Sequence, residues 1–223
     1  MSRSITHPLP VCRQIALQAG LTPKVVAVSH GERTFSYRML NERVNQLGHY
    51  LIERGLRPGD FAAVHCGRTP EAVIAMLAIQ KAGAAYLPMD SLYPVARLEY
   101  MLADSGARMV VTCGDYAEGF SETSSTIIHL DTIDAELGTF NKNEPDVSID
   151  AESAFSIIYT SGSTGQSKGA IIRHDAFENL VTWYVNVLEL DSNDSVFLIT
   201  SLAFDLTQKN IYAPLVAGAS LRL

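Results

Sequence analysis

The feature that most constrains the fold is an alternation of short apolar runs with helical segments between residues 61 and 130. The run 61–66 is β-prone, and Pro70 follows it at a position where a helix can begin. A second helix can begin at Pro94. Because strand–helix–strand alternation is typical of parallel strands joined by crossover helices, we predict an α/β fold with mostly parallel sheets flanked by helices. The predicted strands of this region are 61–66, 84–89, 109–113 and 126–130.

The segments on either side extend this pattern. Ser36 is placed to cap a helix whose apolar stripe runs from Leu40 to Leu51 and which ends near Gly55. Residues 131–152 are polar and turn-rich, which predicts a surface connection with a short helix at 133–137. The remaining predictions are helices at 9–19, 174–190 and 206–216, an apolar run at 24–29, and strands at 195–200 and 219–223. For the domains, we predict a tail at 1–8, a first α/β subdomain at 9–152, and the phosphate loop with the start of a second α/β subdomain at 153–223.

Composition and charge argue against several classes of protein. The 223 residues are 47% apolar, which is enough for a sizeable core. The net charge is −7, from 17 basic and 24 acidic side chains, and no Lys/Arg cluster stands out along the chain. We therefore expect no nucleic-acid binding. An anionic ligand would have to be bound by local donors, because the chain carries no general positive field.

The cysteines and the apolar segments indicate a soluble cytoplasmic protein. Cys12, Cys66 and Cys113 show no metal-ligand spacing and suggest no disulfide framework, so we predict buried thiols in a reducing compartment and no metal site. The N-terminus lacks the pattern of a signal peptide. The most apolar helical stretch, 72–85, is interrupted by Gln80 and Lys81, so we expect no membrane span.

A loop rich in hydrogen-bond donors follows the β-prone run 155–159. Residues 160–169 hold three glycines, five hydroxyl side chains and one lysine. Glycines let backbone N–H groups approach a ligand closely, hydroxyls donate hydrogen bonds, and Lys168 adds a positive charge. This donor set suits a polyphosphate. The loop is not the standard P-loop, since GxxxxGK[ST] starting at Gly162 requires glycine where this chain has Ser167. A flexible Ser/Gly connection between two strands is the structural alternative.

The string Tyr-Thr-Ser-Gly-Ser-Thr-Gly-x-x-Lys-Gly at 159–169 resembles the phosphate loop of the adenylate-forming enzymes. In particular, it is similar to the loop of the adenylation domains of nonribosomal peptide synthetases, which usually have proline where this chain has Ser167. The resemblance implies that the fold is the first part of that family's large N-terminal domain. It also implies catalytic roles for Thr164 and Lys168. The residues that it implies as ligands of the ATP phosphates are Thr160, Ser161, Gly162, Ser163, Thr164, Gly165 and Lys168.

A second candidate site lies at 201–207, where an apolar strand delivers Asp205 just before a helix. The structural alternative is that Asp205 or Thr207 binds the first free N–H groups of that helix. A carboxylate held at the end of a buried strand can also pair with an ammonium group. The segment resembles the family's Phe-Asp-x-Ser motif, with Thr207 in place of serine. The resemblance implies that Asp205 binds the α-ammonium of an amino acid, and acyl-activating relatives often lack this aspartate.

Phe204, Leu206 and Lys209 complete the candidate substrate site. Phe204 belongs to the same motif, while Leu206 and Lys209 fall on positions that line the side-chain pocket in the family. Lys209 either pairs with a polar or acidic substrate side chain or extends into solvent with its stem buried. His174 matches a histidine that often follows the family's loop, and a structural or helix-start role fits it better than catalysis. Residues 81–106 and 35–41 resemble two further blocks of the family, which carry no chemistry.

The resemblance runs from about residue 30 to the C-terminus, with four motifs in the family's order. It implies an enzyme in which an amino-acid carboxylate attacks the α-phosphate of Mg·ATP, giving an aminoacyl-adenylate and pyrophosphate. The aminoacyl group then passes to the phosphopantetheine thiol of a carrier domain. The implied cofactors are ATP and Mg²⁺. The implied partners are the amino acid, the carrier domain, the rest of the adenylation domain and a small helper protein of the MbtH-like kind.

The sequence departs from the family in its extent. The family's adenine-binding segment, Mg-linked glutamate, ribose-binding aspartate and C-terminal lysine have no counterpart before Leu223. We therefore expect the chain to work as part of a longer synthetase and to be inactive alone. Two alternatives stay open: a fragment of an acid–CoA ligase, and a non-catalytic fragment that binds ATP or an amino acid. The missing basic surface and missing class motifs argue against an aminoacyl-tRNA synthetase.

Overall fold

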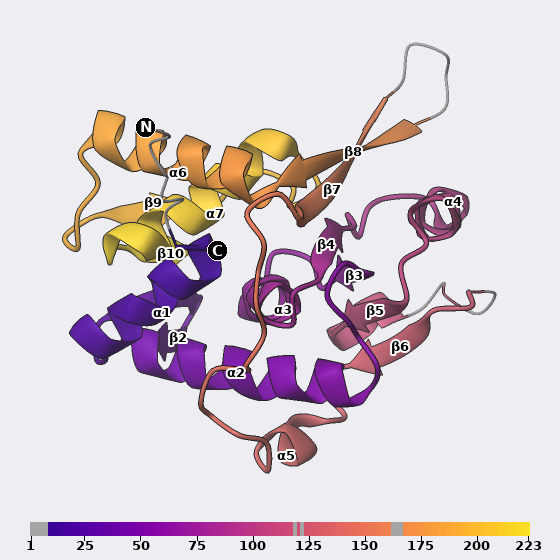
Figure 1. The fold of residues 1–223 in the computed structure, drawn as a ribbon, viewed down its shortest axis with the longest axis horizontal. Helices are drawn as coiled ribbons and strands as arrows, with labels where there is room; N and C mark the ends of the chain where they lie inside the picture. Colours follow the sequence, from indigo (N-terminus) through magenta and orange to yellow (C-terminus); the bar gives the residue numbers. More distant parts are fainter. Residues whose placement is uncertain (1–8, 118–119, 121–122, 162–166) are drawn as a thin grey trace, which may run out of the picture.

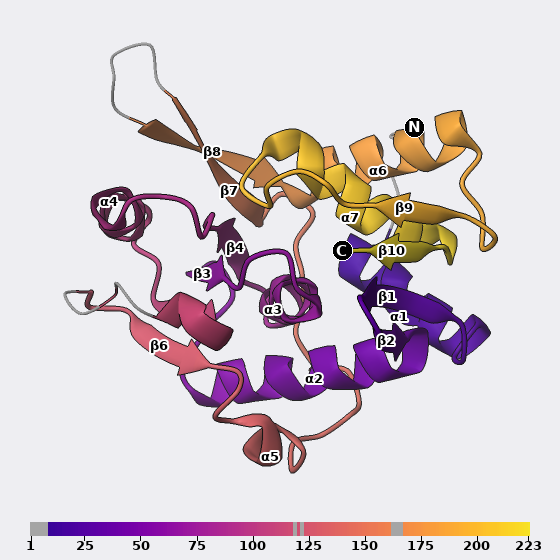
Figure 2. The same cartoon turned by 180° about the vertical axis from the view of Figure 1, so that it is seen from behind.

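The computed structural model describes residues 9–117, 120, 123–161 and 167–223, so the predicted tail at 1–8 lies outside the described residues. The chain folds into two sheets with helices between and around them (Figures 1 and 2). The helices are α1 (Val11–Leu21), α2 (Tyr37–Glu53), α3 (Pro70–Lys81), α4 (Val95–Ser105), the 3₁₀ turn η1 (Gly114–Ala117), α5 (Asp134–Leu137), α6 (His174–Leu188) and α7 (Asp205–Ala217). The strands are β1 (Val26–His30), β2 (Arg33–Ser36), β3 (Phe61–His65), β4 (Ala85–Pro88), β5 (Met109–Thr112), β6 (Thr126–His129), β7 (Ala154–Ser161), β8 (Ser167–Arg173), β9 (Ser195–Phe197) and β10 (Ser220–Arg222).

The larger sheet has the strand order β6-β5-β3-β4-β7-β8. Its first five strands pair in parallel, and β8 closes the edge antiparallel to β7. Alternate side chains of β3 enter different cores, because successive residues of a strand point to opposite faces. Ala62 and Val64 join the core that contains α3, and Ala63 joins the core under α4. This architecture confirms the predicted α/β fold class.

Helix α3 lies between the two sheets (Figure 1), with contacts to β3 and β4 of the larger sheet and to β1 of the smaller one. All of its residues except Glu71 are buried, as expected for a helix that is apolar on nearly every side. Its predicted start is confirmed: Pro70 is the first residue, and Thr69 Oγ1 accepts a hydrogen bond of 3.3 Å from the Ala72 N–H. The predicted cap of α2 is confirmed as well, since Ser36 Oγ accepts from the Met39 N–H at 3.3 Å.

The smaller sheet joins strands from the two ends of the chain in the order β2-β1-β10-β9. Strand β1 pairs in parallel with β10, and β10 pairs in parallel with β9. Sheet membership therefore crosses the subdomain boundary that we predicted at residue 152, because β7 and β8 belong to the larger sheet and β9 and β10 to the smaller one. Strand β2 was not predicted. It spans only four residues, too few for a visible alternation, and it pairs with β1 across the turn after His30.

None of the helices in the described ranges is long and apolar enough to cross a membrane.

Candidate functional site

An antiparallel hairpin carries the predicted phosphate loop. In the hairpin, Thr160 pairs with Lys168, and Ser161 with Ser167. Strands β7 and β8 project from the body of the molecule (Figure 1). Thr160 and Lys168 therefore lie opposite each other where the loop begins and ends, and both are exposed. The other predicted phosphate ligands, Gly162, Ser163, Thr164 and Gly165, lie outside the described residues, and Ser161 is described by its backbone alone.

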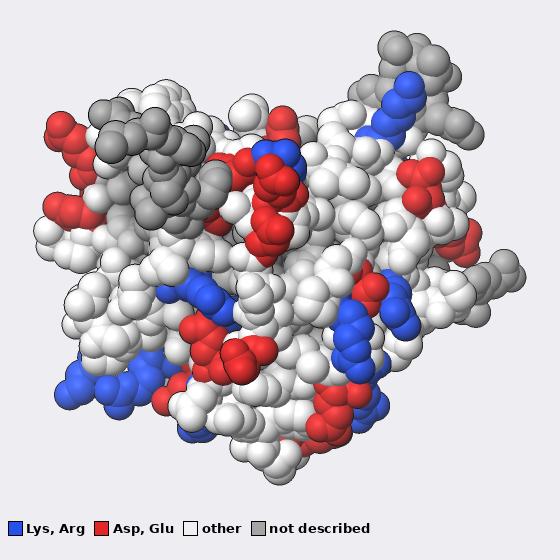
Figure 3. Space-filling model, in the orientation of Figure 1, with Lys and Arg blue, Asp and Glu red and all other residues white. Residues whose placement is uncertain are grey.

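Positive charge near the hairpin is local. In Figure 3, basic atoms appear on the projecting hairpin, and both acidic and basic side chains are scattered over the rest of the face shown. No continuous basic surface covers the described residues on that face. The exposed Lys168 thus brings a positive charge to the loop within a chain of net charge −7. This distribution suits an anion bound by local donors.

Helix α4 supports the hairpin from one side, near its loop end. The Tyr100 hydroxyl donates to the Ser167 carbonyl at 3.0 Å, and the Tyr159 hydroxyl donates to Asp104 Oδ2 at 2.6 Å. The two tyrosine rings meet edge to face, with centroids 6.3 Å apart. Burial, reinforced by the Asp104 carboxylate, raises the pKa of Tyr159, so its hydroxyl stays protonated and remains a donor. Sequence reasoning missed this support, because α4 was assigned to the scaffold.

Because Gly169 on β8 has no side chain, the side chains of two β7 residues can lie directly against its backbone. A Cβ at this position would lie 2.6 Å from Cδ1 of Ile157 and 3.1 Å from Cζ of Tyr159. Distances below 3.0 Å are not found between real side-chain atoms and a Cβ, so any larger residue would move Ile157. The glycine that ends the loop motif therefore has a packing reason in addition to any role toward a ligand.

Asp205 is the first residue of α7, and it is exposed. Phe204 occupies the N-cap position and makes no side-chain capping bond. The Asp205 carboxylate accepts a hydrogen bond of 2.7 Å from the Leu206 N–H, one of the free groups of the first turn. The structural alternative is thus confirmed in part. Thr207 instead pairs with the Thr200 hydroxyl at 2.7 Å. A carboxylate is favoured at this end of a helix by the helix dipole.

The segment that leads to Asp205 is held by the ends of β3 and β4. Arg68, which follows β3, donates to the Ile199 carbonyl at 2.8 Å. Asp90, which follows β4, accepts a hydrogen bond from the Ser201 hydroxyl. Gln208 on α7 donates to the Leu202 carbonyl at 2.5 Å. None of these three supporting residues was predicted. Arg68 lies in the connection between a predicted strand and a predicted helix, Asp90 lies in a region interpreted as scaffold, and Gln208 lies inside a helix.

The remaining candidate substrate residues lie around the start of α7. Phe204 and Leu206 are 61% and 69% exposed. Lys209 Nζ donates to the Leu206 carbonyl at 2.9 Å and lies 5.1 Å from the centre of the Tyr184 ring on α6. The predicted contacts of Phe204, Leu206 and Lys209 with a substrate stay predictions.

His174 starts α6 and is buried. Its backbone N–H donates to the Ser153 carbonyl at 3.1 Å, and its ring packs edge-on against Phe155 at 5.3 Å. Its Nδ1 lies 3.7 Å from Oε1 of the equally buried Glu178. These contacts fit the structural role at a helix start that we expected.

A crevice of about 770 Å³ lies where strands of both sheets end. Its lining comes from residues that close or follow β1, β3, β4, β9 and β10, and it includes Arg68, Asp90 and Ser201. In α/β proteins, ligands bind at the carboxyl ends of parallel strands. The crevice thus lies at the same edge of the molecule as Arg68 and Asp90, which hold the segment before Asp205.

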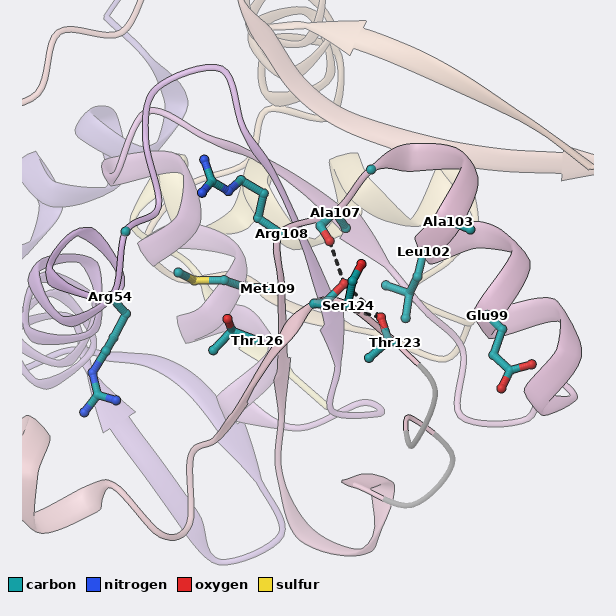
Figure 4. A pocket seen from close by; sticks show the side chains of 13 residues that line it. Arg54, Glu99, Leu102, Ala103, Ala107, Arg108, Met109, Thr123, Ser124 and Thr126 are labelled. Atoms are coloured by element: carbon teal, nitrogen blue, oxygen red, sulfur yellow. Dashed lines mark hydrogen bonds between the residues drawn. The ribbon is translucent and has the colours of Figure 1, made fainter.

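A second cavity, of about 520 Å³, lies at the opposite edge, near the amino ends of β5 and β6 (Figure 4). Its two arginines are already paired, Arg54 with Glu136 and Arg108 with Asp60. Two of its hydroxyls are also engaged, since Thr123 donates to the Ser125 hydroxyl at 3.0 Å and Ser125 donates to the Ala107 carbonyl at 2.6 Å. Because ligands of parallel sheets bind at the other edge, we do not assign the phosphate site to this cavity.

Known proteins of related sequence include peptide synthases. The chain is 37% identical over 201 residues to bacitracin synthase 3 from Bacillus licheniformis, a match that covers 90% of this chain and 3% of that protein. It is 33% identical over 207 residues to the dimodular nonribosomal peptide synthase from Bacillus subtilis, covering 92% of this chain and 9% of that protein. The chain therefore spans only a small share of the length of these relatives.

Solved structures share the fold. The nonribosomal peptide synthetase FmoA3 in its α-methyl-L-serine-AMP-bound form matches with a TM-score of 0.90 and 26% identity, over 99% of this chain and 24% of that one. Its AMPPNP-bound form matches with a TM-score of 0.89 and 26% identity, over 99% and 23%. The family model described as "AMP-binding enzyme" matches residues 15–223. The chain, with its loop hairpin and its aspartate at the start of α7, belongs to the AMP-binding enzyme family.

Proposed function

We propose that this chain supplies the phosphate loop and the amine anchor of an amino-acid-activating adenylation site, as part of a longer synthetase. A carboxylate oxygen of the amino acid attacks the α-phosphorus of ATP. The bond from that phosphorus to the oxygen bridging to the β-phosphate breaks, and pyrophosphate leaves. The aminoacyl group of the resulting adenylate then passes to the phosphopantetheine thiol of a carrier domain, and AMP is released. The matched peptide synthases and the synthetase solved with AMPPNP and with an amino-acid adenylate support this proposal.

The observation that carries the proposal is the pairing of Thr160 with Lys168 across the hairpin. One hydroxyl and one ammonium group stand at the two ends of the same donor-rich loop, where they can hold the β- and γ-phosphates of ATP. Neutralising charge on the departing pyrophosphate lowers the barrier, because these donors are already in position when the charge develops. The loop residues Ser161, Gly162, Ser163, Thr164 and Gly165 would complete this set of donors.

Asp205 would anchor the substrate amine. Its carboxylate sits at the start of α7, on a segment fixed by Arg68 and Gln208. Only one of its oxygens is engaged by the Leu206 N–H in the described contacts. The second oxygen can therefore accept from an ammonium group, and a charge-assisted hydrogen bond of this kind is roughly twice as strong as a neutral one. Phe204, Leu206 and Lys209 are proposed to border the substrate side chain.

We expect Mg²⁺ to arrive with ATP, bound to the phosphates of the nucleotide. The described residues contain no group of three or more His, Cys, Asp or Glu side chains that could hold a metal ion. That this chain supplies no ligand to Mg²⁺ stays a prediction. The carrier domain and a helper protein of the MbtH-like kind stay predictions based on the resemblance. A cytoplasmic location stays a prediction based on the cysteines and the apolar segments of the sequence.

The test measures amino-acid-dependent exchange of pyrophosphate into ATP by the synthetase that carries this chain, alongside ATP binding by the chain itself. Lys168→Ala should lower exchange by roughly 100-fold, the usual loss when one donor to a developing charge is removed. The control is Lys142→Ala, an exposed lysine paired with Glu42, which should leave exchange unchanged. Exchange supported by carboxylic acids without an α-amine would indicate an acid–CoA ligase instead. ATP binding without any exchange would indicate the non-catalytic alternative.

A further inference from the structure

Two cysteines lie side by side where β3 and β5 end. The strands pair in parallel, with the last residues His65 and Thr112 opposite each other. Cys66 directly follows β3, and Cys113 directly follows β5. Neighbouring strands are about 4.8 Å apart, and disulfides join Cα atoms about 4.4–6.8 Å apart. Both side chains belong to the core that contains α3, so they point to the same face of the sheet. The usual spacing of neighbouring strands thus lies within the range that a disulfide spans.

The contacts of the two sulfur atoms cross from one strand to the other. Cys113 Sγ lies 3.8 Å from the Cys66 carbonyl oxygen, and Cys66 Sγ lies 3.6 Å from the Val111 carbonyl oxygen. Thr69 bridges the same corner, because its hydroxyl donates to the Cys66 carbonyl at 2.9 Å and lies 3.8 Å from Cys113 Sγ. These contacts bring the two thiols to the same corner of the sheet. Their geometry is that of a dithiol pair.

The two thiols differ in reactivity and in access. The adjacent Cys66 thiol lowers the pKa of Cys113, against the effect of burial. The adjacent Cys113 thiol and burial raise the pKa of Cys66. Cys113 also borders a cavity of about 580 Å³, together with Thr69, Glu71 and Tyr116, and Cys66 does not line this cavity. Cys113 is therefore the thiol that a small reagent reaches first in its thiolate form, with Cys66 directly behind it.

We propose that Cys113 and Cys66 form an oxidation site for hydrogen peroxide, with Cys113 as the attacking thiol and Cys66 as the resolving thiol. The Cys113 thiolate attacks one peroxide oxygen and the O–O bond breaks, giving a sulfenic acid and hydroxide, which takes up the proton that Cys113 released. The Cys66 sulfur then attacks the Cys113 sulfur, the S–O bond breaks, and the oxygen leaves as water with the Cys66 proton. Two thiols and one peroxide thus give one disulfide and two waters.

The disulfide would lock a corner that supports the segment before Asp205. Cys66 is followed by Gly67 and by Arg68, whose guanidinium binds the Ile199 carbonyl. Thr69, which contacts both cysteines, also caps α3. A disulfide between the ends of β3 and β5 would restrain both the Arg68 contact and the start of α3. The proposal does not depend on the adenylation reaction, so it stands or falls separately from the proposed function.

The test treats the folded chain with hydrogen peroxide, alkylates the remaining thiols after denaturation in acid, and measures intact mass and cross-linked peptides. The chain has three free cysteines, Cys12, Cys66 and Cys113. We expect one linked peptide pair, 66 with 113, and alkylation of Cys12 alone. Burial raises the pKa of the Cys12 thiol to about 12, which makes Cys12→Ser the matched control, and this variant should form the same disulfide.

The single variants separate the two roles. Cys66→Ser should stop at the sulfenic acid of Cys113, which dimedone traps. Cys113→Ser should lower the rate of peroxide-dependent thiol loss by about tenfold or more, because the remaining thiols are mostly protonated. Three free thiols in the folded wild-type chain after peroxide treatment would overturn the proposal. It would equally be overturned by a disulfide that involves Cys12, joins two chains, or forms only in urea.

Discussion

The hydroxyl of Tyr86 on β4 donates a hydrogen bond of 2.6 Å to Oε1 of Gln208 on α7, and both side chains are fully buried. The amide of Gln208 in turn donates to the Leu202 carbonyl at 2.5 Å. One buried side chain therefore connects β4, one of the two central strands of the larger sheet, to the segment that presents Asp205. Because a buried polar group that loses its partner keeps its desolvation penalty, this pair should matter for stability.

We expect Tyr86→Phe and Gln208→Leu each to lower the free energy of unfolding by roughly 1–3 kcal/mol, since each leaves a buried partner unsatisfied. The double variant should lose about 1 kcal/mol less than the sum of the two, because the partners act together. Urea titrations of the four proteins measure this coupling. Tyr184→Phe is the control, since its hydroxyl meets Asn210 at 3.0 Å in a half-buried site and should contribute only about 0.5 kcal/mol. Strictly additive losses would show that the pair is not coupled.

Local signals in the sequence predicted the elements well. Pro70 predicted where α3 begins, and Ser36 predicted the cap of α2, because caps and first-turn residues act within a few positions along the chain. Long-range pairing left no such signal. Strand β1 lies beside β10, and nothing in the pattern at 24–29 indicates that partner, since alternation specifies which face is buried and not which strand is adjacent.

In the candidate site, too, local motifs could be predicted from the sequence and long-range contacts could not. The motifs predicted Lys168 and Asp205, and the structure places them at the end of a hairpin and at the start of a helix. The residues that hold these segments could not be predicted. Tyr100 contacts Ser167, and Gln208 is held by Tyr86, in both cases across elements that are distant in the sequence. Each of the two has the pattern of an ordinary helix position. Such supporting contacts depend on how the helices pack on the sheets.

Gly169→Ala should destabilise the hairpin. The new Cβ would lie 2.6 Å from Cδ1 of Ile157, and overpacking of this kind costs about 1–3 kcal/mol. Combining it with Ile157→Val removes the clashing methyl group and should recover about half of the loss. Thermal unfolding and ATP titration give the two measurements. The control is Gly20→Ala, where no atom lies within 4 Å of the added Cβ and a gain is expected. No loss at Gly169, or no recovery in the double variant, would contradict the packing argument.

Asp205→Asn should separate amino acids from plain carboxylic acids. Removing one charge of a desolvated ion pair costs about 2–5 kcal/mol, so exchange with the amino acid should fall at least roughly 30-fold in the synthetase. Any weak exchange with the same acid lacking its amine should stay unchanged, because that substrate has no ammonium group to bind. Asp191→Asn serves as the control, since asparagine keeps the acceptor for the Asn193 N–H. An equal loss for both substrates would assign Asp205 a structural role.

His65 should make stability depend on pH. Its Nδ1 lies 2.8 Å from the Tyr116 carbonyl, which selects the Nδ1–H tautomer, and its ring packs edge-on against Phe120. Burial lowers the pKa of His65, against the hydrogen bond to Tyr116 and the charge of Asp90, which raise it. The unfolded chain therefore binds a proton at higher pH than the folded chain does. The stability contributed by neutral His65 is full above about pH 6.5 and is lost as the pH falls through the folded pKa.

The measurement is the urea midpoint of the wild type and of His65→Gln between pH 8 and pH 5. Glutamine can still donate to the Tyr116 carbonyl but does not titrate, so the variant should lack this part of the pH dependence. Below pH 6.5 the wild type should lose stability relative to the variant with a slope of at most about 1.4 kcal/mol per pH unit, the limit for one proton. The control His30→Gln replaces an exposed histidine and should leave the wild-type profile unchanged. Parallel profiles for the wild type and His65→Gln would show that His65 titrates alike in the folded and unfolded chain.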